Sequence, residues 1–545
     1  MTDYAPTTDT PVSVREATFS IWKRLGMTTI FSNPGSTEVP LLRDLPSEFN
    51  FILGLHEASV VGMATGFALS AERPALALLH TTADLGNAVG AIATARVNRA
   101  PLVVVVGQED RRHLIHQPFL KGELRDMAGT YPVWLAEPAM ARDVPSLIAR
   151  AWYEAKAKRG PALVIVPMDD WDQDASPNAI AAPIMIETSV GGSDNGLAQL
   201  IEIIKVSANP AIVVGADADS RETWETLTQL AEKLACPVWQ ESFGARAGYP
   251  QDHQLFQGHL PSGKSRLRTT LAGHDLLLVV GAPAFRQYPY EPGPFVNDGT
   301  RIAIISENME VATSSTGELA VIGPIADLCL RLVDHIDTRN AQVRKPHRIA
   351  PPIGRALRAG NVFATLADRI SPDTLIIEES PSSRFELQER LPARHPFSFL
   401  SAAMGGLGFA MPAAIGVRIA TPRRPVIAIV GDGSSMYSFQ AIWSAVHYHV
   451  GVIFVIMNNG SYSIMDRLAE QSGYSAAVWP TLESIDICKL AEGFGCTAHK
   501  VATKGELEAI LDRLLPSLDT LNHPVLLDVS VESDLTFEPC LSLSR

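Results

Sequence analysis

The chain has 545 residues, 46% hydrophobic and 19% charged, so it is long enough for about three packed domains. A net charge of −14 with no basic cluster argues against a nucleic-acid-binding protein, because nothing is placed to neutralise phosphates. Five scattered cysteines without metal-site spacing, a start without a secretory signal and the lack of a long apolar run predict a cytoplasmic protein that does not enter a membrane.

Short strands rich in Val, Ile and Leu alternate with helical segments along the chain, which is typical of parallel sheets covered by helices. We therefore predict an α/β fold class with three doubly wound parallel-sheet domains. They span residues 1–180, 195–337 and 357–545, separated by a Pro/Ala-rich stretch and by a basic, proline-punctuated connector. The candidate strands of the first two domains are residues 28–31, 74–79, 101–106, 162–166, 211–214, 276–280 and 302–305.

The segment FILGLHEASVVGMATGFALS, residues 51–70, places Glu57 between an apolar strand and a helix of small and apolar residues. Two interpretations are open. The carboxylate could simply stabilise the start of the helix through the helix dipole. It could also be an acid–base group, since proton sharing is strong in an apolar, water-poor setting.

The most informative stretch is VIAIVGDGSSMYSFQAIWSAVHYHVGVIFVIMNNG, residues 426–460. It predicts a βαβ unit in which Asp432 follows one strand and Asn459 follows the next, at the sheet edge where ligands bind. A carboxylate, an amide oxygen and the backbone carbonyl of Ser461 suit Mg²⁺, while glycines and a helix opening near Ser434 suit a diphosphate. Taken singly, the Gly-Asp-Gly and Asn-Asn motifs are most often turns and loops, but the pair at this spacing is much rarer.

The two motifs together resemble the signature of thiamine-diphosphate (ThDP) enzymes. Residues 32–46, 78–91 and 281–293 further resemble the benzoylformate decarboxylase branch of the 2-oxo acid decarboxylases, and matching segments run from about residue 25 to residue 535. The resemblance implies a ThDP-binding fold with pyrimidine-binding, central Rossmann-like and diphosphate-binding domains. It also implies ThDP and Mg²⁺ as cofactors, no FAD, and a homodimer or homotetramer with active sites at subunit interfaces.

Catalytic residues follow from the resemblance by motif. Glu57 would hydrogen-bond the coenzyme pyrimidine, Ser36 the substrate carboxylate, and His80 would move protons near neutral pH. Ser36 could instead be a turn residue, and His80 could be a histidine at a strand end whose hydrogen bonds are made within the fold. Tyr288 stands where the family has a second active-site histidine, and a phenol is a poorer proton shuttle near neutrality. The implied cofactor-binding residues are Glu57, Asn87, Ser382, Gly405, Leu407, Asp432, Gly433, Ser434, Ser435, Tyr437, Asn459 and Tyr462.

Leu407, between two glycines, would support the coenzyme from below, although a tight packing turn is the alternative. The implied metal ligands are Asp432, Asn459 and Ser461, and the implied substrate pocket comprises Ser36, His80, Tyr288, Ile464, Met465 and Leu468. Compared with the family, Pro381 replaces a threonine and the pocket is bulkier near Ile464 and less aromatic. A basic group formed by Arg111, Arg112, His113 and His116 is either a solvated stretch or a site for a second anionic group on the substrate.

These expectations predict an enzyme that decarboxylates an aryl or branched 2-oxo acid to an aldehyde and CO₂, with carboligase side activity. The alternative is a ThDP-dependent carboligase or lyase acting on 2-hydroxy ketones or related 2-hydroxyacyl compounds. With fewer histidines to relay protons, the enamine formed after loss of CO₂ would react more often with an aldehyde than with a proton. A non-catalytic protein of the same fold, serving as a binding partner, is a third possibility.

Overall fold

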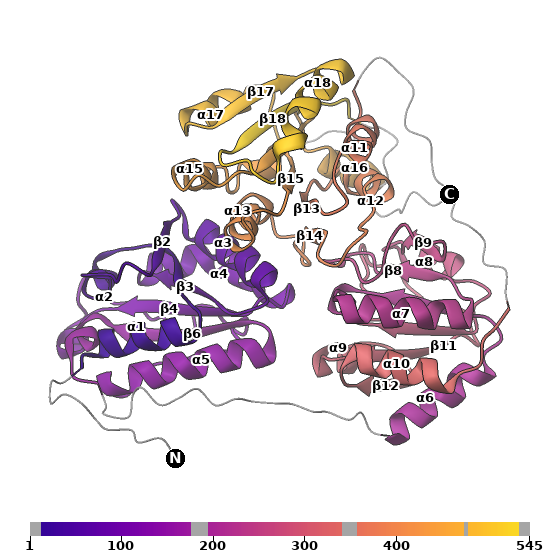
Figure 1. Cartoon of the computed structure of the whole chain (residues 1–545), viewed down its shortest axis with the longest axis horizontal. Helices are drawn as coiled ribbons and strands as arrows, with labels where there is room; N and C mark the ends of the chain where they lie inside the picture. Colours follow the sequence, from indigo (N-terminus) through magenta and orange to yellow (C-terminus); the bar gives the residue numbers. More distant parts are fainter. Residues whose placement is uncertain (1–11, 176–193, 341–356, 474–477, 534–545) are drawn as a thin grey trace. The chain divides into compact units, whose positions relative to one another are not determined.

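The computed structural model describes residues 12–175, 194–340, 357–473 and 478–533 (Figure 1). Most of the two predicted linkers lies outside these described residues. Three six-stranded sheets form the fold, and every paired strand within them is parallel. The predicted α/β class with three parallel sheets is therefore confirmed.

The first sheet has the strand order β2-β1-β3-β4-β6-β5. Because β2 and β3 lie on opposite sides of β1, the winding reverses between β1 and β3, and ligands bind at such reversals. Strands β3 and β4 are buried along their whole length, which explains their continuous apolar sequences. The elements are β1 (Thr29–Asn33), β2 (Asn50–Leu53), β3 (Ala75–Leu79), β4 (Leu102–Gln108), β5 (Trp134–Ala136), β6 (Pro161–Pro167), α1 (Val14–Arg24), α2 (Val39–Leu42), α3 (Glu57–Ala71), α4 (Thr82–Val97) and α5 (Val144–Lys158).

The second sheet has the order β12-β11-β10-β7-β8-β9. Its edge strands β9 and β12 and the three-residue strand β8, like β5 of the first sheet, were not predicted, because short and partly exposed strands carry little apolar signal. The elements are β7 (Pro210–Val214), β8 (Val238–Gln240), β9 (Phe256–His259), β10 (Leu276–Val280), β11 (Arg301–Ser306), β12 (Leu319–Ile322), α6 (Asp194–Val206), α7 (Arg221–Leu234), α8 (Lys264–Thr270), α9 (Met309–Ser314) and α10 (Ile325–His335).

The third sheet has the order β14-β13-β15-β16-β18-β17, so its winding reverses between β13 and β15. The predicted βαβ unit is present as β15, the following helices and β16. The strands are β13 (Leu375–Glu379), β14 (Phe399–Ser401), β15 (Val426–Gly431), β16 (Ile453–Asn458), β17 (Thr497–Val501) and β18 (Val525–Ser530). The helices are α11 (Ala359–Ala367), α12 (Arg384–Arg390), α13 (Ala410–Ala420), α14 (Asp432–Ser435), α15 (Ala441–His447), α16 (Ser463–Gln471), α17 (Ile487–Gly493) and α18 (Lys504–Leu514).

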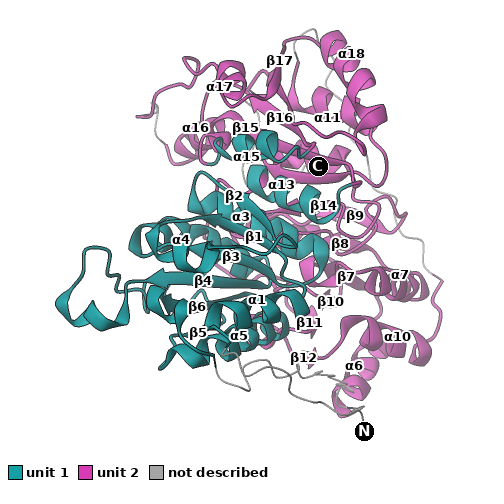
Figure 2. Ribbon diagram, turned by 60° about the vertical axis from the view of Figure 1, so that its left-hand side comes forward, with its two compact units in different colours: residues 1–186, 411–422, 438–450 teal, residues 187–410, 423–437, 451–545 magenta. Residues whose placement is uncertain are grey.

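The chain divides into two compact units, coloured separately in Figure 2. The first holds the first sheet together with residues 411–422 and 438–450, and the second holds the other two sheets. Within the first unit the Ser444 hydroxyl donates to the carbonyl of Leu53 at 2.7 Å. Gly66 allows α3 to approach α13 closely, because a Cβ there would lie 2.1 Å from the carbonyl oxygen of Ala413. Among the helices that the structure describes, none combines the length and the apolar character needed to span a bilayer.

Candidate active site

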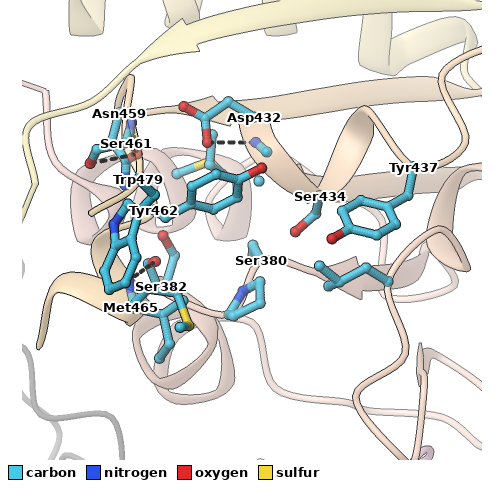
Figure 3. A pocket seen from close by; sticks show the side chains of 17 residues that line it. Ser380, Ser382, Asp432, Ser434, Tyr437, Asn459, Ser461, Tyr462, Met465 and Trp479 are labelled. Atoms are coloured by element: carbon cyan, nitrogen blue, oxygen red, sulfur yellow. Dashed lines mark hydrogen bonds between the residues drawn. The ribbon is translucent and has the colours of Figure 1, made fainter. Parts of the chain in front are cut away.

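A pocket of roughly 370 Å³ opens in the second unit at the carboxyl ends of β13, β15 and β16, where the third sheet reverses its winding (Figure 3). This volume is in the range of small-molecule sites, and the location is where open parallel sheets bind ligands. The lining residues are Ser380, Pro381, Ser382, Ser383, Leu407, Gly431, Asp432, Gly433, Ser434, Tyr437, Met457, Asn459, Ser461, Tyr462, Ile464, Met465 and Trp479.

Asp432 is a buried carboxylate in this pocket. Its Oδ1 accepts the N–H of Gly433 at 2.8 Å and its Oδ2 accepts the N–H of Gly460 at 2.7 Å. Burial raises the pKa of Asp432, against the opposing effect of backbone N–H groups. Because both donors are neutral backbone groups, a cation bound beside the carboxylate would be electrostatically favourable.

Asn459 and Ser461 complete an all-oxygen group beside Asp432. The Asn459 amide is oriented by two contacts: its Nδ2 donates to the Ser463 hydroxyl at 3.0 Å, and its Oδ1 accepts the N–H of Ser461 at 3.0 Å. Within the described ranges there is no cluster of three or more His, Cys, Asp or Glu that could hold a metal ion. A carboxylate, an amide oxygen and a carbonyl form a different kind of donor set, and this set fits Mg²⁺.

The rest of the pocket carries both polar and apolar side chains. Figure 3 shows Ser434 and Tyr437 on one side and Met465 and Trp479 on the other. The Ser382 hydroxyl accepts the N–H of Ile464 at 3.1 Å and so links the loop after β13 to the start of α16. The Trp479 indole, which the sequence did not single out, donates to the Asp466 carboxylate at 2.9 Å.

Besides Tyr288, which is described below, three residues of the second unit that were expected around this site are not among those that line it. Ser435 is fully buried, and its hydroxyl donates to the carbonyl of Asp432 at 2.7 Å. Gly405 contributes a left-handed backbone conformation (φ 69°) to the loop that carries Leu407. Leu468 lies one turn beyond Ile464 on α16. Leu407 itself lines the pocket and is 36% exposed.

A second group of polar residues lies in the first unit around Glu57, the first residue of α3. Its Oε1 accepts the side-chain amide of Asn33 at 2.7 Å, and its Oε2 accepts that of Asn87 at 2.8 Å. Burial would raise the pKa of Glu57, but these hydrogen bonds outweigh it and the pKa is below its usual value. Glu57 is thus a buried, oriented acceptor. The sequence missed Asn33, whose position at the end of β1 was the available signal.

His80 follows β3, across the winding reversal from Ser36 and Thr37. Its Nδ1 lies 3.2 Å from Oε2 of Glu38 and 2.7 Å from the Thr37 hydroxyl, which itself donates to Oε1 of Glu38 at 2.6 Å. The bond to Glu38 is the main cause of a raised His80 pKa. We assign the Nδ1 proton to this contact, which leaves Nε2 as the nitrogen that gains and loses a proton.

The turn that carries these groups depends on Gly35, because a Cβ there would lie 2.5 Å from the His80 ring. Ser36 is exposed beside it, whereas Thr37 and Glu38 are buried. Asp84 accepts the backbone N–H of His80 at 3.0 Å, and burial raises the pKa of Asp84 to about 6. The sequence did not single out Glu38 or Thr37, since their contacts with His80 join segments about forty residues apart. It also missed Asp84, although Asp84 lies only four residues after His80 in the chain.

Tyr288 lies in the second unit, 50% exposed, and does not line the pocket described above. Its backbone is held by Ser262, whose carbonyl accepts the N–H of Tyr288 at 3.2 Å and whose hydroxyl donates to its carbonyl at 2.8 Å. In this position the phenol has access to solvent.

Three of the four members of the basic group, Arg111, Arg112 and His113, are paired with carboxylates of the first unit. Arg111 makes a bidentate ion pair with the buried Asp170. Its Nε donates to Oδ1 at 2.7 Å and its Nη2 donates to Oδ2 at 2.8 Å. Arg112 pairs with Asp110, and His113 lies 3.4 Å from Glu109. These contacts favour a structural role over recognition of a second anionic group.

Comparison with known proteins agrees with this geometry. Family models match three parts of the chain: the thiamine pyrophosphate enzyme N-terminal TPP binding domain over residues 12–128, the central domain over 197–332, and the C-terminal TPP binding domain over 382–529. Benzoylformate decarboxylase of Pseudomonas aeruginosa is 35% identical over 542 residues, covering 97% of this chain and 100% of the relative.

Two solved structures are similar over the same length. A ThDP-dependent 4-hydroxybenzoylformate decarboxylase of Rhodococcus jostii RHA1 has a TM-score of 0.91, and benzoylformate decarboxylase of Polynucleobacter necessarius has a TM-score of 0.90. Each is 32% identical and covers 96% of this chain and 100% of that structure. The chain therefore belongs to the thiamine pyrophosphate enzyme family. Within that family it is a ThDP-dependent decarboxylase homologous to benzoylformate decarboxylase.

Proposed function

We propose that the protein decarboxylates an aromatic 2-oxo acid, of the benzoylformate or 4-hydroxybenzoylformate type, to an aldehyde and CO₂, using ThDP and Mg²⁺. The observation that carries the proposal is the oxygen-rich pocket at the winding reversal of the third sheet, with Asp432 and Asn459 on adjacent strand ends. Relatives whose names specify these two substrates cover nearly the whole chain.

We assign the metal ligands to Asp432, Asn459 and the Ser461 carbonyl. We assign the diphosphate contacts to polar groups of the pocket, including Ser382, Gly433 and Ser434. ThDP, when bound, supplies the electron sink that makes loss of CO₂ feasible. Leu407 would support the coenzyme through apolar contact. Glu57, held by Asn33 and Asn87, would hydrogen-bond the coenzyme pyrimidine as a carboxylate and so stabilise a proton on the pyrimidine ring.

Polar and apolar side chains are the proposed substrate-binding groups. The exposed Ser36 hydroxyl would donate to the substrate carboxylate, and His80 would deliver the proton that completes the aldehyde. The contact with Glu38 raises the pKa of His80, which favours the protonated ring that a proton donor requires. The apolar side of the pocket, made of Ile464, Met465 and Trp479, would hold the aryl group.

The alternative function is a ThDP-dependent carboligase or lyase acting on 2-hydroxy ketones. The observation that favours it is Tyr288, a half-exposed phenol where the family has a histidine. A phenol delivers protons poorly near neutral pH, so an aldehyde could compete better for the reactive carbon. Tyr288→His should therefore lower the ratio of 2-hydroxy ketone to aldehyde, measured with a 2-oxo acid plus added benzaldehyde.

We also propose a homodimer or homotetramer in which sites form between subunits. In support, two separate TPP binding domains of the family match the amino-terminal and carboxyl-terminal parts of the chain. Light scattering coupled to size-exclusion chromatography tests the assembly. Pairing inactive Glu57→Gln with inactive Asp432→Ala subunits tests shared sites, because mixed assemblies should regain part of the activity.

The deciding experiment measures CO₂ release by the ThDP- and Mg²⁺-loaded protein from a panel of 2-oxo acids. The panel contains benzoylformate, its 4-hydroxy analogue, phenylpyruvate, branched 2-oxo acids and pyruvate. Fastest turnover of an aryl member supports the proposal. Cleavage of 2-hydroxy ketones that is faster than CO₂ release from every member would replace it with the alternative.

A further inference from the structure

Glu379, the last residue of β13, is a buried carboxylate that accepts three backbone N–H groups from a distant segment. Its Oε1 accepts the N–H of Gly408 at 2.6 Å, and its Oε2 accepts those of Phe409 and Ala410, each at 2.7 Å. Burial raises the pKa of Glu379 to about 7, whereas the three N–H donors favour its ionised form. Hydrogen bonds to that ionised form are about twice as strong as neutral ones. The end of β13 is therefore firmly attached to residues 408–410.

This attachment lies immediately after Leu407, which projects into the pocket and is 36% exposed. An apolar side chain with this exposure is not held by packing on all sides, so its position depends on the backbone that carries it. That backbone turns at Gly405 (φ 69°) and Gly408 (φ 90°), conformations that side-chain-bearing residues rarely adopt. A Cβ at Gly408 would also lie 3.1 Å from Cβ of Tyr437, so the loop is packed against the polar side of the pocket.

We propose that Glu379 is a positioning residue for the coenzyme: its three backbone hydrogen bonds set where Leu407 stands in the pocket. The inference rests on the proposed function, since it takes ThDP as the occupant. The same strand end also begins the pocket wall, because Ser380, Pro381 and Ser382 follow Glu379 directly and all line the pocket. One carboxylate thus connects two parts of the coenzyme site that are distant in sequence.

Only a carboxylate can accept all three of these hydrogen bonds at residue 379. A glutamine of the same size would replace one accepting oxygen by an NH₂ group facing N–H donors, and would lose at least one of the three bonds. The loop would then move even though the volume at residue 379 is unchanged.

The test is calorimetric titration of ThDP, at saturating Mg²⁺, into the cofactor-free full-length protein. The variants are Glu379→Gln, Leu407→Ala and the double variant. We expect Glu379→Gln to raise the ThDP dissociation constant about tenfold, in line with loss of one charge-assisted hydrogen bond. In the Leu407→Ala background, Glu379→Gln should raise the ThDP dissociation constant less than about twofold. The effects of two substitutions are not additive when one residue acts through the other.

Asp275→Asn is the matched control. Asp275 also accepts several donors, the Ser207 hydroxyl and the N–H groups of Ala208 and Asn209, but on the second sheet. The Asp275→Asn variant should be less thermally stable than the unmodified protein and should bind ThDP with unchanged affinity. If the Glu379→Gln variant does not fold, Gly408→Ala is tested in its place. Gly408→Ala keeps the Glu379 carboxylate but strains the loop, so the variant should bind ThDP more weakly.

Three outcomes would overturn the inference while the proposed function stands: unchanged ThDP affinity in the folded variant, the same loss with and without Leu407, or an equal loss in Asp275→Asn. Failure of the unmodified protein to bind ThDP would overturn the proposed function first, and this inference with it.

Discussion

The Nδ1 atom of His80 lies 3.2 Å from Oε2 of Glu38, and both side chains are largely buried (14% and 4% exposed). The contact joins the residue after β3 to the turn after β1, the two strand ends between which the first sheet reverses its winding. Its consequence is a His80 pKa above the ordinary value, mainly because Glu38 accepts a hydrogen bond from the ring. The proposed proton donor thus depends on a residue that need not touch the substrate.

Replacing Glu38 by glutamine should lower the His80 pKa, since the bond that stabilises the imidazolium loses its negative acceptor. The resonance of the His80 ring, followed by NMR, should titrate at lower pH in Glu38→Gln than in the unmodified protein. The upper pH limit of CO₂ release should move down by the same amount. An unchanged His80 titration would show that Glu38 does not set its charge.

The same change has a defined effect on stability. A raised pKa means that the contact stabilises the fold fully below the unfolded histidine value and that this stabilisation is lost as pH rises through the folded pKa. Glu38→Gln should therefore cost more free energy of unfolding at pH 6 than at pH 9. Urea unfolding at both pH values measures the difference, and a larger cost at pH 9 would contradict this assignment.

Glu57→Gln should lower turnover by about 100-fold or more, because a neutral amide cannot stabilise a proton on the coenzyme pyrimidine as the carboxylate does. Thermal unfolding should change little, since the glutamine keeps the size of the side chain and its oxygen can still accept from Asn33 or Asn87. Ser20→Ala, on the exposed side of α1, is a control that should leave both properties unchanged. Full activity in Glu57→Gln would rule out the assigned role.

Asp432→Asn should weaken Mg²⁺-dependent binding of ThDP, because the carboxylate is the charged member of the proposed ligand set. Removing Mg²⁺ with a chelator should have the same effect on the unmodified protein, and added Mg²⁺ should reverse it. Calorimetric titration with and without the metal provides the measurement. Metal-independent binding of ThDP with unchanged affinity would exclude Asp432 as a ligand.

Ile464→Ala should enlarge the apolar side of the pocket and favour bulkier 2-oxo acids. A change of this size in an apolar contact corresponds to about 10–200-fold in specificity. Ratios of kcat/KM for 4-hydroxybenzoylformate and pyruvate in both proteins measure the change. Leu468→Ala, on the same helix but not lining the pocket, is the matched control. Equal shifts in both variants would place the aryl group elsewhere.

Much of the site could be recognised from the sequence because its signals are local. The Gly-Asp-Gly and Asn-Asn motifs follow buried strands, and strand periodicity is readable over a few residues. Glu57 opens its helix as expected from the apolar residues around it. These features depend on neighbours in the chain, which a single sequence contains.

The sequence by itself determined the three parallel sheets, the strand ends that carry chemistry and the family. Only the tertiary structure decided which side chains support them: Asn33 at Glu57, Glu38 at His80, and Glu379 at residues 408–410. Each of these contacts joins segments 24 to 42 residues apart. No periodicity or spacing rule specifies such partners, because they meet only after the strands have found their order in the sheet.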